Sequence, residues 1–141
     1  MESSQIDLVQ SSFAQVAIVA EDVASMFYWR LFTLDPELRA MFRGDMKEQG
    51  KKLMAMIGGV VGNLRNLDKV VPTIQSLGAR HLGYGVRDEH YETVGTALLW
   101  TLEQGLGHGF TDDVRDAWTA AYTLLASTMR DAASQARTAV A

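Results

Sequence analysis

Apolar residues recur every three or four positions along almost the whole chain. This spacing puts them on one face of an α-helix, whereas a half-buried strand alternates apolar with polar residues. No stretch shows such alternation between turn residues, and prolines stand only at Pro36 and Pro72. The sequence therefore predicts an all-α protein.

Capping and turn residues divide the chain into six or seven predicted helices of unequal length. The first begins at Ser3 or Ser4, and Asp35 before Pro36 predicts a short helical segment to about residue 42. The later helices run from Met46, from the junction at 66–72 to the glycines at 83 and 85, from a cap at Asp88 to the glycine-rich loop at 105–109, and from Thr111. Residues after about 134 are expected to fray. Unequal helices of this kind are not typical of an up-and-down bundle and often surround a ligand.

Three glycines, Gly58, Gly59 and Gly62, fall within the helix that is predicted to begin at Met46. Each costs about 1 kcal/mol of helix stability relative to alanine. Close approach of another helix would offset that cost, so the sequence predicts close backbone packing at these glycines.

The composition fits one soluble globular domain over residues 1–141, because compact domains usually contain about 100–200 residues. Hydrophobic residues make up 48% and charged residues 21%, which argues against disorder and against a membrane span. The 13 basic and 17 acidic residues give a net charge of −4, so no nucleic-acid partner is expected. The N-terminal residues lack the basic segment and apolar run of a secretory signal, and the expected location is cytoplasmic.

The chain contains no cysteine, which excludes disulfides, cysteine-ligated zinc, iron–sulfur clusters and thiol nucleophiles. No H-E-x-x-H or G-x-S-x-G motif occurs, so zinc hydrolysis and serine-hydrolase chemistry lack their residues. The histidines at 81, 90 and 108 are the remaining candidates for metal chemistry.

Of these histidines, only His81 lies on the apolar face of its predicted helix, together with Ile74 and Leu77. It is either a core histidine with satisfied hydrogen bonds or an axial ligand to haem iron, and periodicity does not distinguish the two. His90 is expected to be partly exposed in the first turn of its helix. His108 is expected to be solvated in the glycine-rich loop.

Six motifs occur in the order in which bacterial globins carry them. The first three resemble the distal half of that family and the last three its proximal half: residues 27–32 (FYWRLF), 35–42 (DPELRAMF), 49–53 (QGKKL), 79–86 (ARHLGYGV), 90–95 (HYETVG) and 116–122 (DAWTAAY). The similarity is greatest to single-domain bacterial haemoglobins, to the globin domain of flavohaemoglobins and to neuroglobin-like bacterial globins. The resemblance implies a globin fold, a 3-over-3 helical sandwich around a pocket for haem b.

The resemblance assigns a role to individual residues of that pocket. It implies that His81 is the proximal ligand of the haem iron and that Phe42 wedges the porphyrin, where the alternative is an ordinary core aromatic. Tyr28, Gln49 and Leu53 match the distal residues that contact O2. The further walls of the haem pocket are implied at Val86, Tyr91, Val94 and Leu98.

Two more expectations concern the surroundings of the pocket. Gly50 matches a position where the two distal helices of globins cross closely, and Ala24 is its expected small partner. Lys52 and Arg80 are candidate partners for the haem propionates, with solvated surface charge as the alternative.

The resemblance implies reversible binding of O2, for storage or delivery, with Tyr28 as the hydrogen-bond donor to the ligand. The alternative for Tyr28 is a hydroxyl that faces solvent or bonds a backbone carbonyl. NO and CO are further candidate ligands. If the chain does not bind haem, the remaining alternative is an unassigned α-helical interaction module.

The alternative function is NO detoxification by a nitric oxide dioxygenase reaction. It requires a separate reductase, because a flavin- and nicotinamide-binding domain does not fit within 141 residues. Catalytic members of the family carry a glutamate where this chain has Ala133, and Asp131 is the nearest carboxylate. Tyr91 is therefore expected to lack its usual charged partner, which favours binding over turnover.

Overall fold

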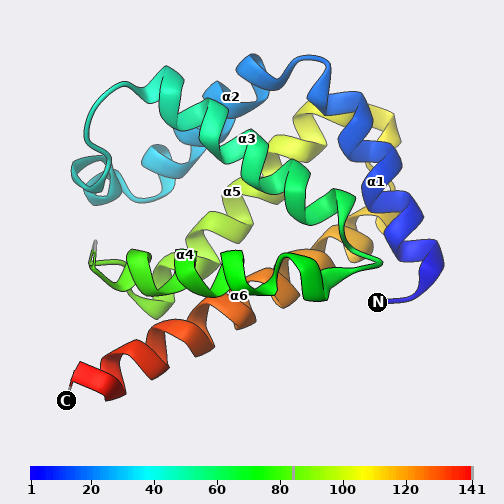
Figure 1. Cartoon of the computed structure of the whole chain (residues 1–141). Coiled ribbons are helices and arrows are strands. Elements are labelled where there is room, and N and C mark those ends of the chain that lie inside the picture. The colour runs from blue at the N-terminus through cyan, green and yellow to red at the C-terminus, as the bar shows by residue number, and fades with distance from the viewer. Residues whose placement is uncertain (84, 141) are drawn as a thin grey trace.

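The computed structural model describes residues 1–83 and 85–140, apart from the side chains of 82, 83 and 137–140. Helices joined by short turns make up these ranges, and no strand occurs in them (Figure 1). Tyr84, which belongs to the motif at 79–86, lies outside the described residues. The α-helices are α1 (Ser3–Ala17), α2 (Ala20–Leu34), α3 (Met46–Gly62), α4 (Val71–Gly83), α5 (Asp88–Leu106) and α6 (Asp112–Val140), and the 3₁₀ segments are η1 (Pro36–Met41), η2 (Leu67–Lys69) and η3 (Gly107–Gly109).

Side-chain caps fix several of the predicted helix starts. The carboxylate of Asp35 accepts from the backbone N–H of Glu37 at 3.2 Å, and Pro36 begins η1, as its fixed φ favours. The Thr111 hydroxyl accepts from the N–H of Val114 at 3.2 Å at the start of α6. Each of these capping side chains bonds a backbone N–H only two or three residues later, which explains why the sequence predicted the caps.

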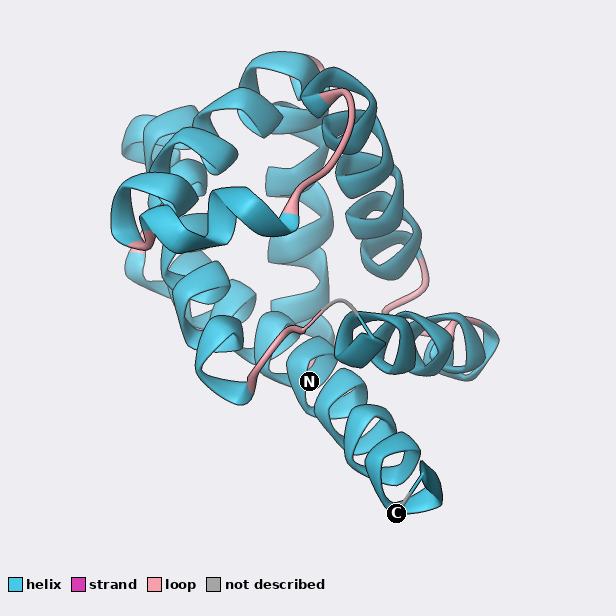
Figure 2. Cartoon of the chain, turned by 90° about the vertical axis from the view of Figure 1, so that its left-hand side faces the viewer, coloured by secondary structure: helices cyan, strands magenta, loops and turns pink. Residues whose placement is uncertain are grey.

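Two helix ends differ from the sequence expectation. Helix α5 begins at Asp88 with Arg87 as its N-cap, because the His90 ring accepts from the Arg87 N–H at 2.9 Å. Helix α6 continues to Val140 instead of fraying after residue 134. Its C-terminal part projects from the other helices in both views (Figures 1 and 2), while buried Ala133 still packs within the fold.

Within residues 1–83 and 85–140, the six α-helices form two layers of three. Helices α1, α3 and α4 lie in front of α2, α5 and α6 in Figure 1. The most extensive contacts between helices join α4 to α6 and α2 to α5, and further contacts join α1 to α6 and α2 to α3. This arrangement is the predicted 3-over-3 sandwich. Within the described ranges, no helix is long and apolar enough to cross a membrane.

In the part of the chain that the structure describes, the core consists of two apolar clusters that meet at Leu53 and Leu98. The larger cluster joins all six α-helices, with Val23 from α2, and the smaller one contains Phe27, Tyr28 and Leu31 of α2. Burying one such side chain contributes about 1.5–3 kcal/mol. The smaller cluster includes Tyr28 and contacts Leu53, so the packing of α2 against α3 determines where these two candidate distal residues lie.

Glycines allow close helix crossings, but mostly not at the predicted positions. A Cβ on Gly50 would lie 3.0 Å from the Cβ of Ala24, which confirms the expected crossing of α2 and α3. By contrast, a Cβ on Gly59 or Gly62 would meet no atom within 4 Å, and one on Gly58 would make only an ordinary contact with a Phe13 ring. The prediction of close packing there was wrong, because these positions do not face another helix backbone.

The tight approaches occur instead at glycines of α4 and α5. A Cβ on Gly78 would collide with backbone atoms of Met129, so α4 and α6 touch backbone to backbone at this point. A Cβ on Gly95 would lie 2.7 Å from the Tyr122 ring, which brings α5 and α6 together. Both contacts hold the helices that carry the candidate proximal residues.

Candidate functional site

His81 occupies the last turn of α4 and is half-buried. Its Nδ1 lies 2.6 Å from the carbonyl oxygen of Leu77, one turn earlier. A carbonyl can only accept, so we assign the ring hydrogen to Nδ1 and the lone pair to Nε2. Burial lowers the pKa of His81, against the opposing effect of the Leu77 hydrogen bond, and nearby Arg80 lowers it further. A neutral imidazole oriented in this way is a metal-ligating group.

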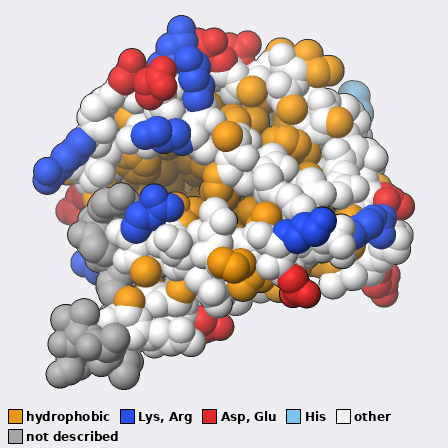
Figure 3. All heavy atoms as spheres, in the orientation of Figure 1, with side chains coloured by type: hydrophobic (Ala, Val, Ile, Leu, Met, Phe, Trp, Pro, Cys, Tyr) orange, Lys and Arg blue, Asp and Glu red, His pale blue; other side chains and the backbone are white. Residues whose placement is uncertain are grey.

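An apolar hollow opens on the face of the molecule shown in Figure 3. Hydrophobic side chains line it and Lys and Arg side chains border it, in the region between α3 and α4. Lys52 and Arg80 are both exposed. An apolar interior with a basic border suits a flat apolar group that carries carboxylates.

The three candidate distal residues lie on α2 and α3. The Tyr28 hydroxyl donates to the backbone carbonyl of Gln49 at 3.3 Å. A bond to a backbone carbonyl was the alternative expected for this hydroxyl. The Gln49 amide donates to the carbonyl of Arg43 at 3.4 Å. Leu53 follows one turn after Gln49 and packs against both apolar clusters. Both hydrogen bonds are long, which makes them weak.

Burial determines the protonation of the Tyr28 phenol. It raises the pKa of Tyr28 to about 12, because the phenolate is poorly solvated there. At neutral pH the hydroxyl therefore retains its hydrogen and remains a donor.

Phe42 follows η1 and joins an aromatic cluster around Tyr28. The Phe42 ring lies edge-on to the Tyr28 ring, with 5.3 Å between centroids, and at the same distance from the Phe32 ring. Edge-to-face contacts of this kind add about 0.5–1.5 kcal/mol each. The cluster connects the turn before α3 to α2, so the candidate porphyrin contact and the candidate donor are positioned together.

The four candidate wall residues belong to α5 and to the turn before it. The Val86 N–H donates to the carbonyl of His81 at 3.0 Å, which places these two residues together. Tyr91 is buried, and the Tyr122 hydroxyl donates to its carbonyl at 2.5 Å. Val94 packs against the smaller apolar cluster, and Leu98 packs against both clusters.

The other two histidines have different environments. His90 is only 4% exposed, so the expectation of a partly exposed side chain was wrong. Its ring turns back to cap α5, which a helical wheel does not show. His108 is exposed, as expected. The described residues contain no group of three His, Asp or Glu side chains that could hold a bare metal ion.

Sequence reasoning missed one residue, Arg130 of α6. Its guanidinium carbon lies 5.0 Å from the centroid of the Tyr91 ring. Tyr91 therefore has a cation as its neighbour, whereas the expectation concerned only the absence of its usual acidic partner. The signal available in the sequence was spacing, because Arg130 follows Tyr122 and Ala126 at intervals of four and shares their helix face.

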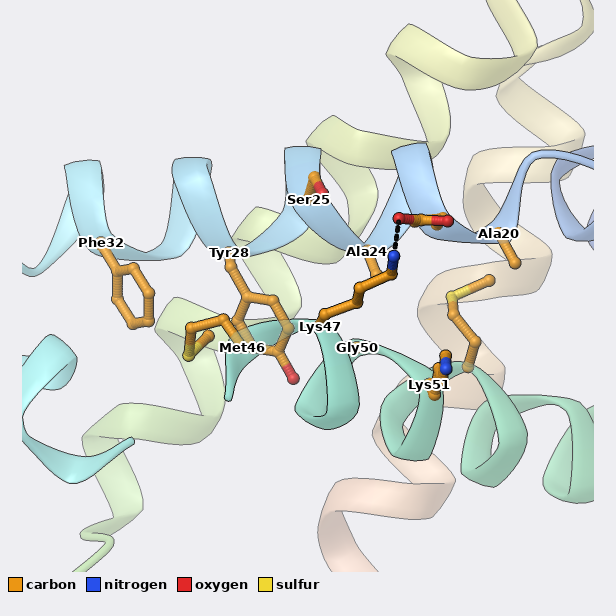
Figure 4. Close-up of a pocket in the computed structure, with 11 residues that line it drawn as sticks. Ala20, Ala24, Ser25, Tyr28, Phe32, Met46, Lys47, Gly50 and Lys51 are labelled. Carbon is orange, nitrogen blue, oxygen red and sulfur yellow. Dashed lines mark ion pairs between the residues drawn. The ribbon is translucent and has the colours of Figure 1, made fainter. Parts of the chain in front are cut away.

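A second pocket, of about 490 Å³, lies between α2 and α3. Figure 4 shows Tyr28 projecting from α2 toward α3 beside Met46. Small residues, including Ala24 and Gly50, line the pocket, and an exposed ion pair between Lys47 and Glu21 spans it at 3.4 Å. The Tyr28 side chain thus borders this pocket.

The comparisons with known proteins identify the family. The Globin family model matches residues 25–129. The chain belongs to the globin family. It is 32% identical over 129 residues to a flavohemoprotein of Xylella fastidiosa, an alignment that covers 89% of this chain and 32% of that protein. The chain thus spans about a third of the length of the flavohemoproteins that it matches.

Solved structures agree on the fold. A bacterial globin from Campylobacter jejuni superposes with a TM-score of 0.84 and 27% identity, covering 95% of this chain and 97% of that one. An engineered carbene transferase from Rhodothermus marinus, described as a candidate nitric oxide dioxygenase, gives a TM-score of 0.90 at 22% identity, covering 99% and 98%. The second likeness supports the fold alone.

This globin is a haem protein, and the donor set fits that cofactor. One neutral imidazole on α4, an apolar hollow and a basic border match an apolar macrocycle with an iron centre and two propionates. The roles of His81, Phe42 and the distal and wall residues stay predictions. So does the closer likeness to neuroglobin-like members of the family.

Proposed function

We propose that this globin binds O2 reversibly, with His81 as the haem ligand and Tyr28 as the donor on the opposite side. The observation that carries the proposal is the environment of His81. Its Nδ1 lies 2.6 Å from the Leu77 carbonyl and burial lowers the ring's pKa, so Nε2 is the nitrogen with which His81 would bind iron.

The Leu77 carbonyl does more than select the tautomer. It also fixes the rotation of the imidazole ring relative to the α4 backbone, since the hydrogen bond is short. The backbone contact between Gly78 and Met129 holds this part of α4 against α6. A ligand side chain on a helix fixed in this way is preorganised for the metal.

Ferrous haem, when bound, supplies the metal site for a gaseous ligand and transfers electron density to O2. The Tyr28 phenol stays protonated and its bond to the Gln49 carbonyl is long, so its hydrogen can turn to a negatively polarised ligand at low cost. A hydrogen bond to such an acceptor contributes about 1.5–3 kcal/mol. Leu53 would keep water from the same side and so protect the reduced state.

The flavohemoprotein relatives support a second candidate function, nitric oxide dioxygenation. That reaction consumes electrons at each turnover, so this globin would need a reductase, either as a partner or as a further part of a longer protein. The described proximal side offers no buried carboxylate near Ala133: Ala133 is itself buried and Asp131 is exposed. We therefore place O2 binding first.

Haem loading and ligand binding test the proposal together. The haem-loaded protein should show a Soret band and a reversible spectral change with O2, whereas His81→Ala should take up haem at least tenfold more weakly. His108→Ala is the matched control, because that histidine is exposed and should leave both properties unchanged. Equal loss in the two variants would contradict the ligand assignment.

Nitric oxide mixing separates the two candidate functions. Stopped-flow mixing of the oxygenated protein with NO, with a flavin reductase and a nicotinamide donor present, should give at most one nitrate per haem under the first proposal. Sustained nitrate formation over many turnovers would establish the second candidate instead.

A further inference from the structure

Arg130 is held in a defined position on α6. Its Nη2 donates to the carbonyl oxygen of Asp88 at 2.9 Å, and its guanidinium stacks over the Tyr91 ring with 5.0 Å to the centroid. Two contacts from different directions restrict a side chain that is otherwise flexible. The charge therefore occupies a fixed place between α5 and α6.

This charge is also partly removed from solvent. The Nε atom of Arg130 is buried and has no hydrogen-bond partner among the described residues. Reduced solvation extends the range of its electrostatic effect, because less water screens it.

The helix packing brings Arg130 close to His81. Backbone atoms of Met129, the residue before Arg130, block the space where a Cβ on Gly78 would stand. His81 follows Gly78 by three residues, which is about 4.5 Å along the helix axis. The cation and the proposed iron ligand thus lie on two helices in backbone contact, within about one turn of the contact point.

The neighbouring charges do not cancel this cation at Tyr91. Among charged groups, Arg130 has the largest influence on the Tyr91 pKa and lowers it, ahead of the opposite effect of Asp88, while burial raises that pKa overall. The carboxylate of Asp131 is exposed and screened by water. Arg80, next to His81, is exposed as well and is screened in the same way.

We propose that Arg130 sets a positive electrostatic potential on the His81 side of the haem and thereby favours ferrous over ferric iron. This inference rests on the proposed function, because it requires haem iron held at His81. One electron converts the ferric to the ferrous state and lowers the net charge of the site by one, so a nearby cation stabilises the reduced form. Arg130 is thus a positioning residue that acts on the iron through space.

The test is the reduction potential of the haem-loaded protein, measured by spectroelectrochemistry. Arg130→Met keeps an unbranched apolar stem and removes the guanidinium with its charge. We expect the ferric-to-ferrous ratio at a fixed applied potential to rise about tenfold, equivalent to a fall of about 59 mV for one electron. Arg130→Lys retains the charge and should restore most of the difference.

Arg115 provides a matched control on the same helix. Its guanidinium carbon also lies 5.0 Å from a ring centroid, that of Phe110, although its Nη2 bonds the carboxylate of Glu103 at 2.8 Å. It stands fifteen residues earlier, which is about 22 Å along α6. Arg115→Met should leave the potential unchanged.

Each outcome of this comparison decides the inference. Equal potentials in Arg130→Met and Arg115→Met would overturn it, and so would a fall in Arg130→Lys as large as that in Arg130→Met, since this indicates a structural role. If the methionine variant does not fold, Arg130→Gln keeps a donor for the Asp88 carbonyl without the charge. A wild-type protein that takes up no haem would refute the proposed function, whereas unchanged potentials in haem-loaded variants would refute only the role of Arg130.

Discussion

Among the described residues, the Tyr28 hydroxyl makes one long hydrogen bond, to the Gln49 carbonyl at 3.3 Å. That bond is weak enough for a stronger acceptor to displace it. The Phe42 and Phe32 rings around Tyr28 fix its ring, so the oxygen can exchange partners while the ring stays in place. The Tyr28 oxygen thus makes a structural hydrogen bond and is also the atom proposed to donate to bound O2.

Replacing Tyr28 with phenylalanine tests this donor. Loss of a hydrogen bond to a charged acceptor costs about 1.5–3 kcal/mol, so O2 should dissociate about ten to a hundred times faster. CO carries less negative charge, and its dissociation should change by much less. Laser photolysis and stopped-flow replacement of O2 by CO give both rates, and equal effects on the two gases would remove the proposed donor.

The same residue predicts a pH dependence. The pKa of Tyr28 is raised from 10.0 to about 12, so the phenol keeps its hydrogen from neutral pH to beyond the pKa of a solvated tyrosine. The rate of O2 dissociation in the wild-type protein should therefore stay constant up to about pH 10 and rise only as pH approaches 12. An increase centred near pH 10 would indicate a solvated phenol.

At the scale of elements, features that depend on neighbouring residues could be predicted from the sequence, whereas features that depend on tertiary packing could not. The Asp35 cap before Pro36 and the Thr111 cap act within three residues, and both were predicted. The burial of His90 and the neighbours of Gly59 depend on which helix passes nearby, which no local pattern contains. The Gly50 crossing was predicted only because the family resemblance supplied a tertiary contact.

The contact between α4 and α6 is the element-scale feature with the clearest test. A methyl group on Gly78 would collide with the Met129 backbone, which cannot rotate away as a side chain would. Gly78→Ala should lower the free energy of unfolding by about 1–3 kcal/mol and accelerate haem loss, because it displaces the helix that carries His81. Gly59→Ala on α3 is the control, since its Cβ would enter open space and should stabilise by up to about 1 kcal/mol. Urea unfolding followed by circular dichroism measures both, and a neutral Gly78→Ala would contradict the close crossing.

At the scale of the whole molecule, the site joins residues far apart in the sequence. Tyr28, His81 and Arg130 stand on α2, α4 and α6, and only the packing of two three-helix layers brings their helices together. The individual helices and the candidate ligand were accessible from spacing and resemblance. The position of the Arg130 charge beside Tyr91 could not be predicted in this way, because it depends on the distance between two helices.

Haem should therefore stabilise the whole fold rather than one element. A ligand that binds only the folded state adds RT ln(1 + [L]/Kd), which is about 4 kcal/mol at a thousandfold excess over Kd. For a chain of this size, that corresponds to an increase in Tm of about 10 °C. Adding haem to the apoprotein should produce this increase in the wild type and in His108→Ala but only a small part of it in His81→Ala, as measured by thermal circular dichroism. A full increase in His81→Ala would mean that apolar contacts hold the haem without the histidine, and the ligand assignment would then fail while the fold stands.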